Sequence, residues 1–172
     1  PKSERYRPLS VQQKADVQMA MARSLENRGE TEQAIKVYLA VVKKDPRRAD
    51  AYHRLAILHD KKGDATAAEK YYQTAIRKDT DNAELRCDYG YSCYLRRRWR
   101  EAETHLRRAI ALDPDLARAH TNLGLLLSRT GRADEALNEF AKAGCTEAGA
   151  RANLGFALML EKHWSAAEQQ FE

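Results

Sequence analysis

Side chains that could do chemistry are present in this chain, but not at the spacings that catalysis or metal binding requires. Its five histidines contain no pair four residues apart and no H-E-x-x-H motif, so we expect no metal site; they are His53, His59, His105, His120 and His163. The chain shows no glycine-rich phosphate loop and no spacing typical of a nucleophile, a base and an orienting acid. The sequence therefore predicts a chain that is not an enzyme and holds no cofactor.

Thiols and guanidinium groups are the other reactive candidates. The odd number of cysteines, Cys87, Cys93 and Cys145, with no C-x-x-C spacing, is typical of reduced thiols that act as small hydrophobic side chains. The segment Arg96–Arg100 is the densest positive patch and could contact phosphate or an acidic surface. A solvated turn after a helix C-terminus explains it without a ligand, and we favour that interpretation.

Composition excludes several classes of protein. The chain has 172 residues, of which 43% are hydrophobic and 32% charged, with a net charge of +5 spread over nearly every expected helix. No specific nucleic-acid contact is expected from such scattered charge. The longest aliphatic run is Leu125–Leu127, far short of a membrane span, and residues 1–10 contain no apolar signal core. We expect a cytoplasmic chain, or one whose targeting segment lies outside this sequence.

A repeat organises the chain. Ala34, Ala68, Ala102 and Ala136 are each separated by 34 residues, and Ala167 follows after 31. Four places after each alanine comes a large side chain: Tyr38, Tyr72, Leu106, Phe140 and Phe171. Apolar residues recur at intervals of three and four, which predicts two helices per repeat. Gly29, Gly63 and Gly131 would end the first helices, Pro46 and Pro114 would follow the second ones, and Ser10 with Gln13 predicts a capped start near Val11.

These residues resemble the tetratricopeptide repeat (TPR) family, whose motif runs W-x₂-L-G-x₂-Y, then A-x₃-F, then P. The fourth repeat matches it with His120, Leu123, Gly124, Leu127, Ala136, Phe140 and Ala143. The resemblance implies an all-α fold, a right-handed superhelical solenoid of antiparallel helix pairs. We expect a tail at 1–14 that includes the start of the first helix, and a TPR domain over 15–172 with repeats at 15–48, 49–82, 83–116, 117–147 and 148–172.

Two departures from the repeat predict local differences. Arg97 and Lys162 stand where other repeats have the turn glycine, and each is followed two places on by a tryptophan, Trp99 and Trp164, that we expect to pack over the turn. The fourth repeat is shortened near Gly144–Thr146, which should change the angle between helices there. The chain also ends inside the expected second helix of the fifth repeat, so we expect a fragment of a longer protein.

The resemblance implies that a peptide or partner protein binds along the concave face, which the first helix of every repeat lines. Counting along these helices gives the candidate contact residues: Arg54, Ile57, Tyr91, Tyr94, Arg118, Asn122, Leu125, Asn153 and Phe156. The apolar members could instead pack against the neighbouring repeat, and we weigh the two interpretations equally. Asn122 and Asn153 could pair with a peptide backbone or simply be solvated amides.

The leading hypothesis is a non-catalytic protein–protein interaction scaffold. Three alternatives stay open. The chain could be the substrate-recruiting TPR arm of a larger enzyme, for example a glycosyltransferase. It could be a bacterial secretion or pilus-assembly TPR protein. It could also self-associate through an uncapped C-terminal helix.

Overall fold

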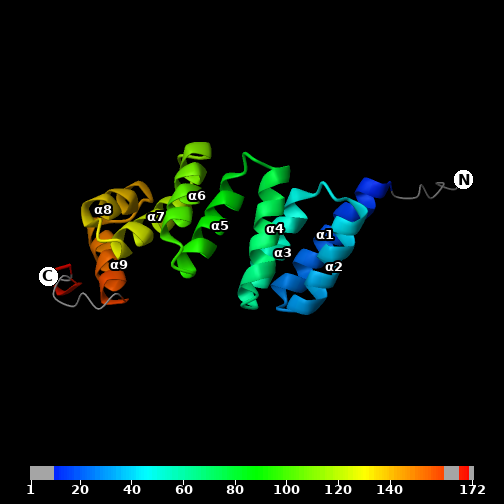
Figure 1. Cartoon of the computed structure of the whole chain (residues 1–172), viewed down its shortest axis with the longest axis horizontal. Coiled ribbons are helices and arrows are strands. Elements are labelled where there is room, and N and C mark those ends of the chain that lie inside the picture. The colour runs from blue at the N-terminus through cyan, green and yellow to red at the C-terminus, as the bar shows by residue number, and fades with distance from the viewer. Residues whose placement is uncertain (1–9, 161–166, 171–172) are drawn as a thin grey trace, which may run out of the picture. The chain divides into compact units, whose positions relative to one another are not determined.

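Within residues 10–160 and 167–170, which the computed structural model describes, the chain is built of helices (Figure 1). Nine helices are defined in these ranges: α1 Val11–Asn27, α2 Thr31–Lys44, α3 Ala49–Lys61, α4 Ala65–Lys78, α5 Ala83–Leu95, α6 Trp99–Leu112, α7 Ala117–Arg129, α8 Ala133–Lys142 and α9 Glu147–Leu160. The all-α class predicted from the apolar periodicity is thereby confirmed.

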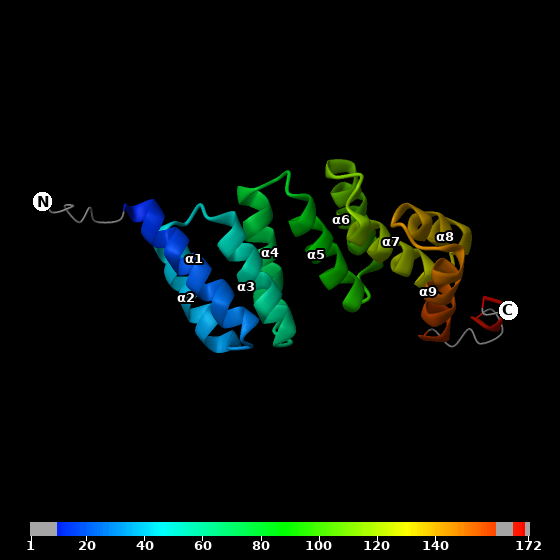
Figure 2. The same cartoon turned by 180° about the vertical axis from the view of Figure 1, so that it is seen from behind.

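The helices belong to two compact units, an N-terminal unit at residues 1–80 and a C-terminal unit at 81–172. In the N-terminal unit, α1 packs on α2, α2 on α3 and α3 on α4, as Figures 1 and 2 show from opposite sides. In the C-terminal unit α5 packs on α6, and α7 contacts α5, α6, α8 and α9. In α2, α6 and α8, the second helix of a repeat thus packs against the first helix of its own repeat and against the first helix of the next repeat.

The helix boundaries follow the local signals in the sequence. Ser10 caps α1: its hydroxyl accepts a hydrogen bond from the backbone N–H of Gln13, whose side chain accepts one from the backbone N–H of Ser10. Gly29, Gly63 and Gly131 end α1, α3 and α7 with φ of 78°, 77° and 79°. This left-handed conformation is strained for residues with a Cβ, which explains the glycines at these turns.

The turn after α5 reaches the same conformation without a glycine. Arg97 has φ of 58°, the one positive value among the described non-glycine residues. Trp99 follows at the start of α6, with its ring 5.7 Å from that of Tyr94 and the guanidinium of Arg129 5.4 Å over it. The expected packing of Trp99 near this turn is therefore confirmed, whereas Trp164 lies outside the described residues.

The shortened repeat has a shorter second helix. Helix α8 has 10 residues, against 14 in each of α2, α4 and α6. Gly144 takes φ of 83°, and the hydroxyl of Thr146 accepts a hydrogen bond from the N–H of Gly149 in the first turn of α9. The sequence correctly located this turn at residues 144–146, while the expected change of helix angle stays a prediction.

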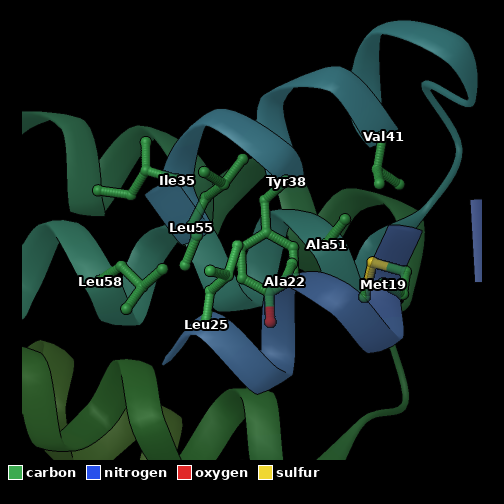
Figure 3. Close-up of a cluster of buried hydrophobic side chains, with 10 residues drawn as sticks. Met19, Ala22, Leu25, Ile35, Tyr38, Val41, Ala51, Leu55 and Leu58 are labelled. Carbon is green, nitrogen blue, oxygen red and sulfur yellow. The ribbon is translucent and has the colours of Figure 1, made fainter. Parts of the chain in front are cut away.

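The core of the N-terminal unit forms where α1, α2 and α3 meet around the ring of Tyr38 (Figure 3). Ten buried side chains make up this cluster: Met19, Ala22, Leu25, Ala34, Ile35, Tyr38, Val41, Ala51, Leu55 and Leu58. The alanines that revealed the repeat are among the most buried residues, because a small side chain lets paired helices approach closely.

Candidate partner-binding surface

Two of the predicted contact residues, Arg54 and Ile57, lie on α3 in the N-terminal unit, and both are half-buried. The Arg54 guanidinium forms a bidentate ion pair with Glu26 of α1, in which Nε lies 3.0 Å from Oε2. Glu26 also accepts a hydrogen bond from the Tyr38 hydroxyl at 3.3 Å, and its carboxylate lies 3.7 Å from Lys61 Nζ. Arg54 is therefore held in one orientation by a carboxylate whose side chain is only 7% exposed.

Burial and charge set the protonation of this cluster. Burial, followed by the negative charge of Glu26, raises the pKa of Tyr38 to about 12. Burial works against the charged form of Arg54, but the hydrogen bonds and charge of Glu26 outweigh it and raise the Arg54 pKa. At neutral pH the cluster therefore holds a cationic Arg54 guanidinium and a neutral Tyr38 phenol.

In the C-terminal unit, Tyr91, Leu125 and Phe156 occupy the same position of α5, α7 and α9. Tyr91 is 39% exposed and Phe156 54% exposed, while Leu125 is half-buried. An exposed aromatic side chain leaves apolar area in water that a partner could cover. Each first helix of this unit therefore carries an apolar side chain at this position.

Tyr94 lies one turn beyond Tyr91 on α5 and is buried, at 6% exposure. Its ring is stacked on that of Tyr91 at 5.8 Å between centroids, and the Arg129 guanidinium lies 5.5 Å over it. Tyr94 thus supports the exposed Tyr91 ring from within. Burial of this kind depends on α6 and α7, so counting positions along α5 did not show it.

The polar members of the predicted set have defined partners. Arg118 on α7 forms an ion pair with Asp88 on α5, 2.7 Å apart, and about half of the Arg118 side chain is exposed. Asn122 is buried and donates a hydrogen bond to Cys87 Sγ at 3.4 Å. Asn153 is half-buried, and its side-chain nitrogen lies 4.0 Å from Cys145 Sγ.

The three cysteines form no disulfide, as their spacing predicts: Cys87 and Cys93 are buried and Cys145 is half-buried. Burial raises the pKa of Cys87 to about 11. Because the thiolate is the reactive form, Cys87 behaves at neutral pH as a small apolar side chain that also accepts the Asn122 hydrogen bond.

The basic segment Arg96–Arg100 and its neighbours on α6 are accompanied by acids. Arg98 pairs with Glu101 within the first turn of α6, Arg107 with Glu103 at 2.8 Å, and Arg108 with Asp81 at 3.2 Å. These exposed pairs neutralise part of the positive charge that the sequence alone suggests. They support our interpretation of the segment as a solvated turn and helix start.

His120 is a buried polar residue whose role the sequence did not indicate. Its Nδ1 lies 2.6 Å from Glu139 Oε2, and its Nε2 lies 2.9 Å from the carbonyl oxygen of Pro114. Burial would raise the pKa of Glu139, but hydrogen bonds from Lys142 and His120 lower it. His120 therefore links α7 to Glu139 on α8 and to the turn before α7. A histidine at the position where the second repeat has Tyr52 is the sequence feature that could have indicated this contact.

Within residues 10–160 and 167–170, no group of three or more His, Cys, Asp or Glu side chains is placed to hold a metal ion. No helix in these ranges combines the length and the apolar character needed to cross a membrane.

Comparison with known families agrees with the helix pattern. The tetratricopeptide repeat model matches residues 19–83, and the model of the Cilia and flagella-associated protein 70 middle TPR-like domain matches residues 52–168. The chain belongs to the TPR family. A comparison with curated protein sequences gives no match.

Solved TPR structures share this fold. The structure described as the functional characterisation of Pseudomonas aeruginosa PilF is 25% identical with a TM-score of 0.77, and the match covers 93% of this chain and 74% of PilF. YrrB, described as a TPR protein with an unusual peptide-binding site, is 25% identical with a TM-score of 0.69, covering 89% of this chain and 80% of YrrB. MamA is 24% identical with a TM-score of 0.73, and the match covers 91% of this chain and 87% of MamA.

Proposed function

We propose that this TPR chain is a non-catalytic scaffold that binds a peptide or partner protein on the first-helix face of its C-terminal unit. We define that face by its accessible members, Tyr91, Arg118, Leu125, Asn153 and Phe156, supported by the buried Tyr94 and Asn122. The observation that carries the proposal is that Tyr91 and Phe156 are exposed at equivalent positions of α5 and α9, with Leu125 between them in the repeat order.

The physical support is that aromatic side chains contribute much of the affinity at protein interfaces. Tyrosine is enriched among the residues whose truncation weakens binding most. Tyr91 is also ordered before binding by its stack on Tyr94, so little side-chain entropy is lost when a partner covers it.

The polar members would add specificity. The exposed half of Arg118 is held by Asp88, and a half-buried amide such as Asn153 can both donate to and accept from a peptide backbone. The description of YrrB as a protein with a peptide-binding site favours a peptide ligand for this chain as well.

In the N-terminal unit, Arg54 and Ile57 would provide a separate contact. The Glu26 carboxylate fixes Arg54, and a fixed guanidinium loses less entropy when it pairs with an acceptor on a partner. We propose this contact as an addition to the aromatic one.

The test is a quantitative crosslinking pull-down from source lysate with the full chain. We compare the wild type, the variant Tyr91→Ala with Phe156→Ala, and a control, Leu39→Ala, whose side chain is 40% exposed but lies on the second helix α2. We expect at least one partner to fall about tenfold with the double variant and to stay unchanged with the control, which corresponds to about 1.4 kcal/mol. Equal capture by all three chains, with helicity preserved, would show that the face is not the binding site.

A further inference from the structure

Helix α1 exposes a face that other first helices bury. In α3 the third, seventh and tenth positions of the repeat are Ala51, Leu55 and Leu58, which are at most 1% exposed. The equivalent residues of α7 and α9 are also buried: Ala119, Leu123, Leu126, Ala150, Leu154 and Ala157. In α1 these positions are Val17, Met21 and Ser24; Val17 is 57% exposed, Met21 is 55% exposed, and Ser24 is exposed too.

The neighbouring pair of helices shows what fits such a face. On α3 the three equivalent residues form one cluster with Ile35, Tyr38 and Val41, which recur every three residues along α2 (Figure 3). Glu32 in the first turn of α2 forms an ion pair of 2.5 Å with Lys62, the residue directly after α3. The start of α2 therefore lies at the end of α3, so the covering helix runs antiparallel to the one it covers.

The charge at the end of α1 repeats that arrangement. Arg28 occupies the position of Lys62, its side chain is 62% exposed, and it pairs with Glu30 at 2.8 Å. A cation here would attract an acidic residue in the first turn of a covering helix, as Lys62 attracts Glu32. The apolar pair and the cation together define the α1 face: Val17, Met21, Ser24 and Arg28.

We propose that the α1 face binds an amphipathic helix of a partner protein. The partner helix runs antiparallel to α1, carries aliphatic or aromatic residues every three positions, and has an acidic residue in its first turn beside Arg28. Burying Val17 and Met21 supplies the driving force, and the acid fixes the direction of the helix.

A second copy of this chain is a poorer source of such a helix. In the described residues, most of the apolar positions equivalent to the α2 stripe are already buried on the other second helices. Tyr72 and Ala75 of α4 are at most 2% exposed, and Leu106 and Ala109 of α6 and Phe140 of α8 are 0% exposed. A copy would have to unpack its own core to offer one of these helices, whereas another protein can present a free amphipathic helix.

The probe for this proposal is a peptide with the sequence of residues 31–44, stapled on its polar side because a free helix of this length is only marginally stable in water. It carries a photoreactive group beside the tyrosine that corresponds to Tyr38. We measure its affinity for the full chain by fluorescence anisotropy and map the crosslinks by mass spectrometry.

We expect crosslinks on α1, an affinity loss of at least tenfold in Met21→Glu, and a several-fold loss in Arg28→Glu. The matched control is Leu39→Glu, an exposed apolar residue away from the α1 face, which should bind the probe as the wild type does. The variant Tyr91→Ala with Phe156→Ala should also bind it normally, which separates this proposal from the proposed function.

Four results would overturn the proposal. They are no binding to the wild type, unchanged binding to Met21→Glu, crosslinks confined to α3 because the probe replaces α2, and self-association of the wild type that Met21→Glu abolishes. The last result would assign the α1 face to a second copy of the chain.

Discussion

The two units fill the same position between paired helices in opposite ways. At the eighth position of the first helix, the N-terminal unit has alanine, Ala22 and Ala56, and each is paired in the repeat pattern with a tyrosine on the second helix. The C-terminal unit has glycine at this position: a Cβ on Gly90 would lie 2.8 Å from Leu106, and one on Gly124 would lie 2.6 Å from the Phe140 ring.

The difference shows that the same repeat pattern allows two kinds of contact, one polar and one apolar, to hold paired helices together. In the N-terminal unit Tyr38 extends its hydroxyl to Glu26, so a buried polar cluster links α1, α2 and α3. In the C-terminal unit Gly124 lets the Phe140 ring approach the backbone of α7, and the contact there is apolar. At this position we therefore expect the N-terminal unit to be sensitive to charge and pH, and the C-terminal unit to added volume.

The largest effect is expected when the polar cluster loses its acid. Glu26→Ala leaves the half-buried Arg54 guanidinium and the buried Tyr38 hydroxyl without their acceptor, which should lower the free energy of unfolding by about 3 kcal/mol. Chemical denaturation measures the loss, and hydrogen exchange should locate it in α1–α3. Glu32→Ala removes an exposed acid as a control and should leave the free energy of unfolding nearly unchanged, because solvent screens its ion pair.

Alkaline pH should weaken the same cluster. The pKa of Tyr38 is about 12 in the folded chain against an ordinary 10, so folding favours the protonated phenol. This contribution is complete below pH 10 and is lost as pH rises towards 12, by about 1.4 kcal/mol per pH unit. Denaturation at pH 9 to 12 should show a steeper decline for the wild type than for Tyr38→Phe, and parallel curves would contradict the assignment.

Added volume should harm the C-terminal unit by a smaller amount. Gly124→Ala forces a methyl group against the Phe140 ring, and we expect a net loss of about 1–2 kcal/mol although alanine favours helix formation. The converse change, Ala56→Gly, should cost about 1 kcal/mol through helix propensity, and the loss of a buried methyl group adds to this cost. Thermal unfolding monitored by circular dichroism compares the two, and a stabilised Gly124→Ala would disprove the close contact.

The smallest expected effect is a gain at the turn after α5. Arg97→Gly relieves a positive φ that glycine adopts without strain, and should stabilise the C-terminal unit by about 0.5–1 kcal/mol. Gly63→Ala introduces the same strain into the N-terminal unit and should cost about 1 kcal/mol. If Arg97→Gly instead lowered the stability by as much as Gly63→Ala does, the contacts of the arginine side chain would outweigh the relief of backbone strain.

Much of the fold could be predicted because its signals are local. The capping pair Ser10 and Gln13, the turn glycines and the substitution by Arg97 act within a few residues of the helix ends they define. The candidate site was less accessible to prediction. Tyr94 and Asn122 hold positions where an accessible side chain was expected, yet both are buried against α6, α7 or α5, which come from elsewhere in the chain.

The sequence by itself determined the repeat, the helix boundaries and the membership of the TPR family, because period, capping and turn conformation depend on neighbours along the chain. Only the tertiary structure decided which first-helix residues face water, how Glu26 gathers Arg54 and Tyr38, and that α1 exposes Val17 and Met21 where α3 buries their equivalents. Burial and ion pairing depend on which helices pack side by side, so identical register positions acquire different surroundings in different repeats.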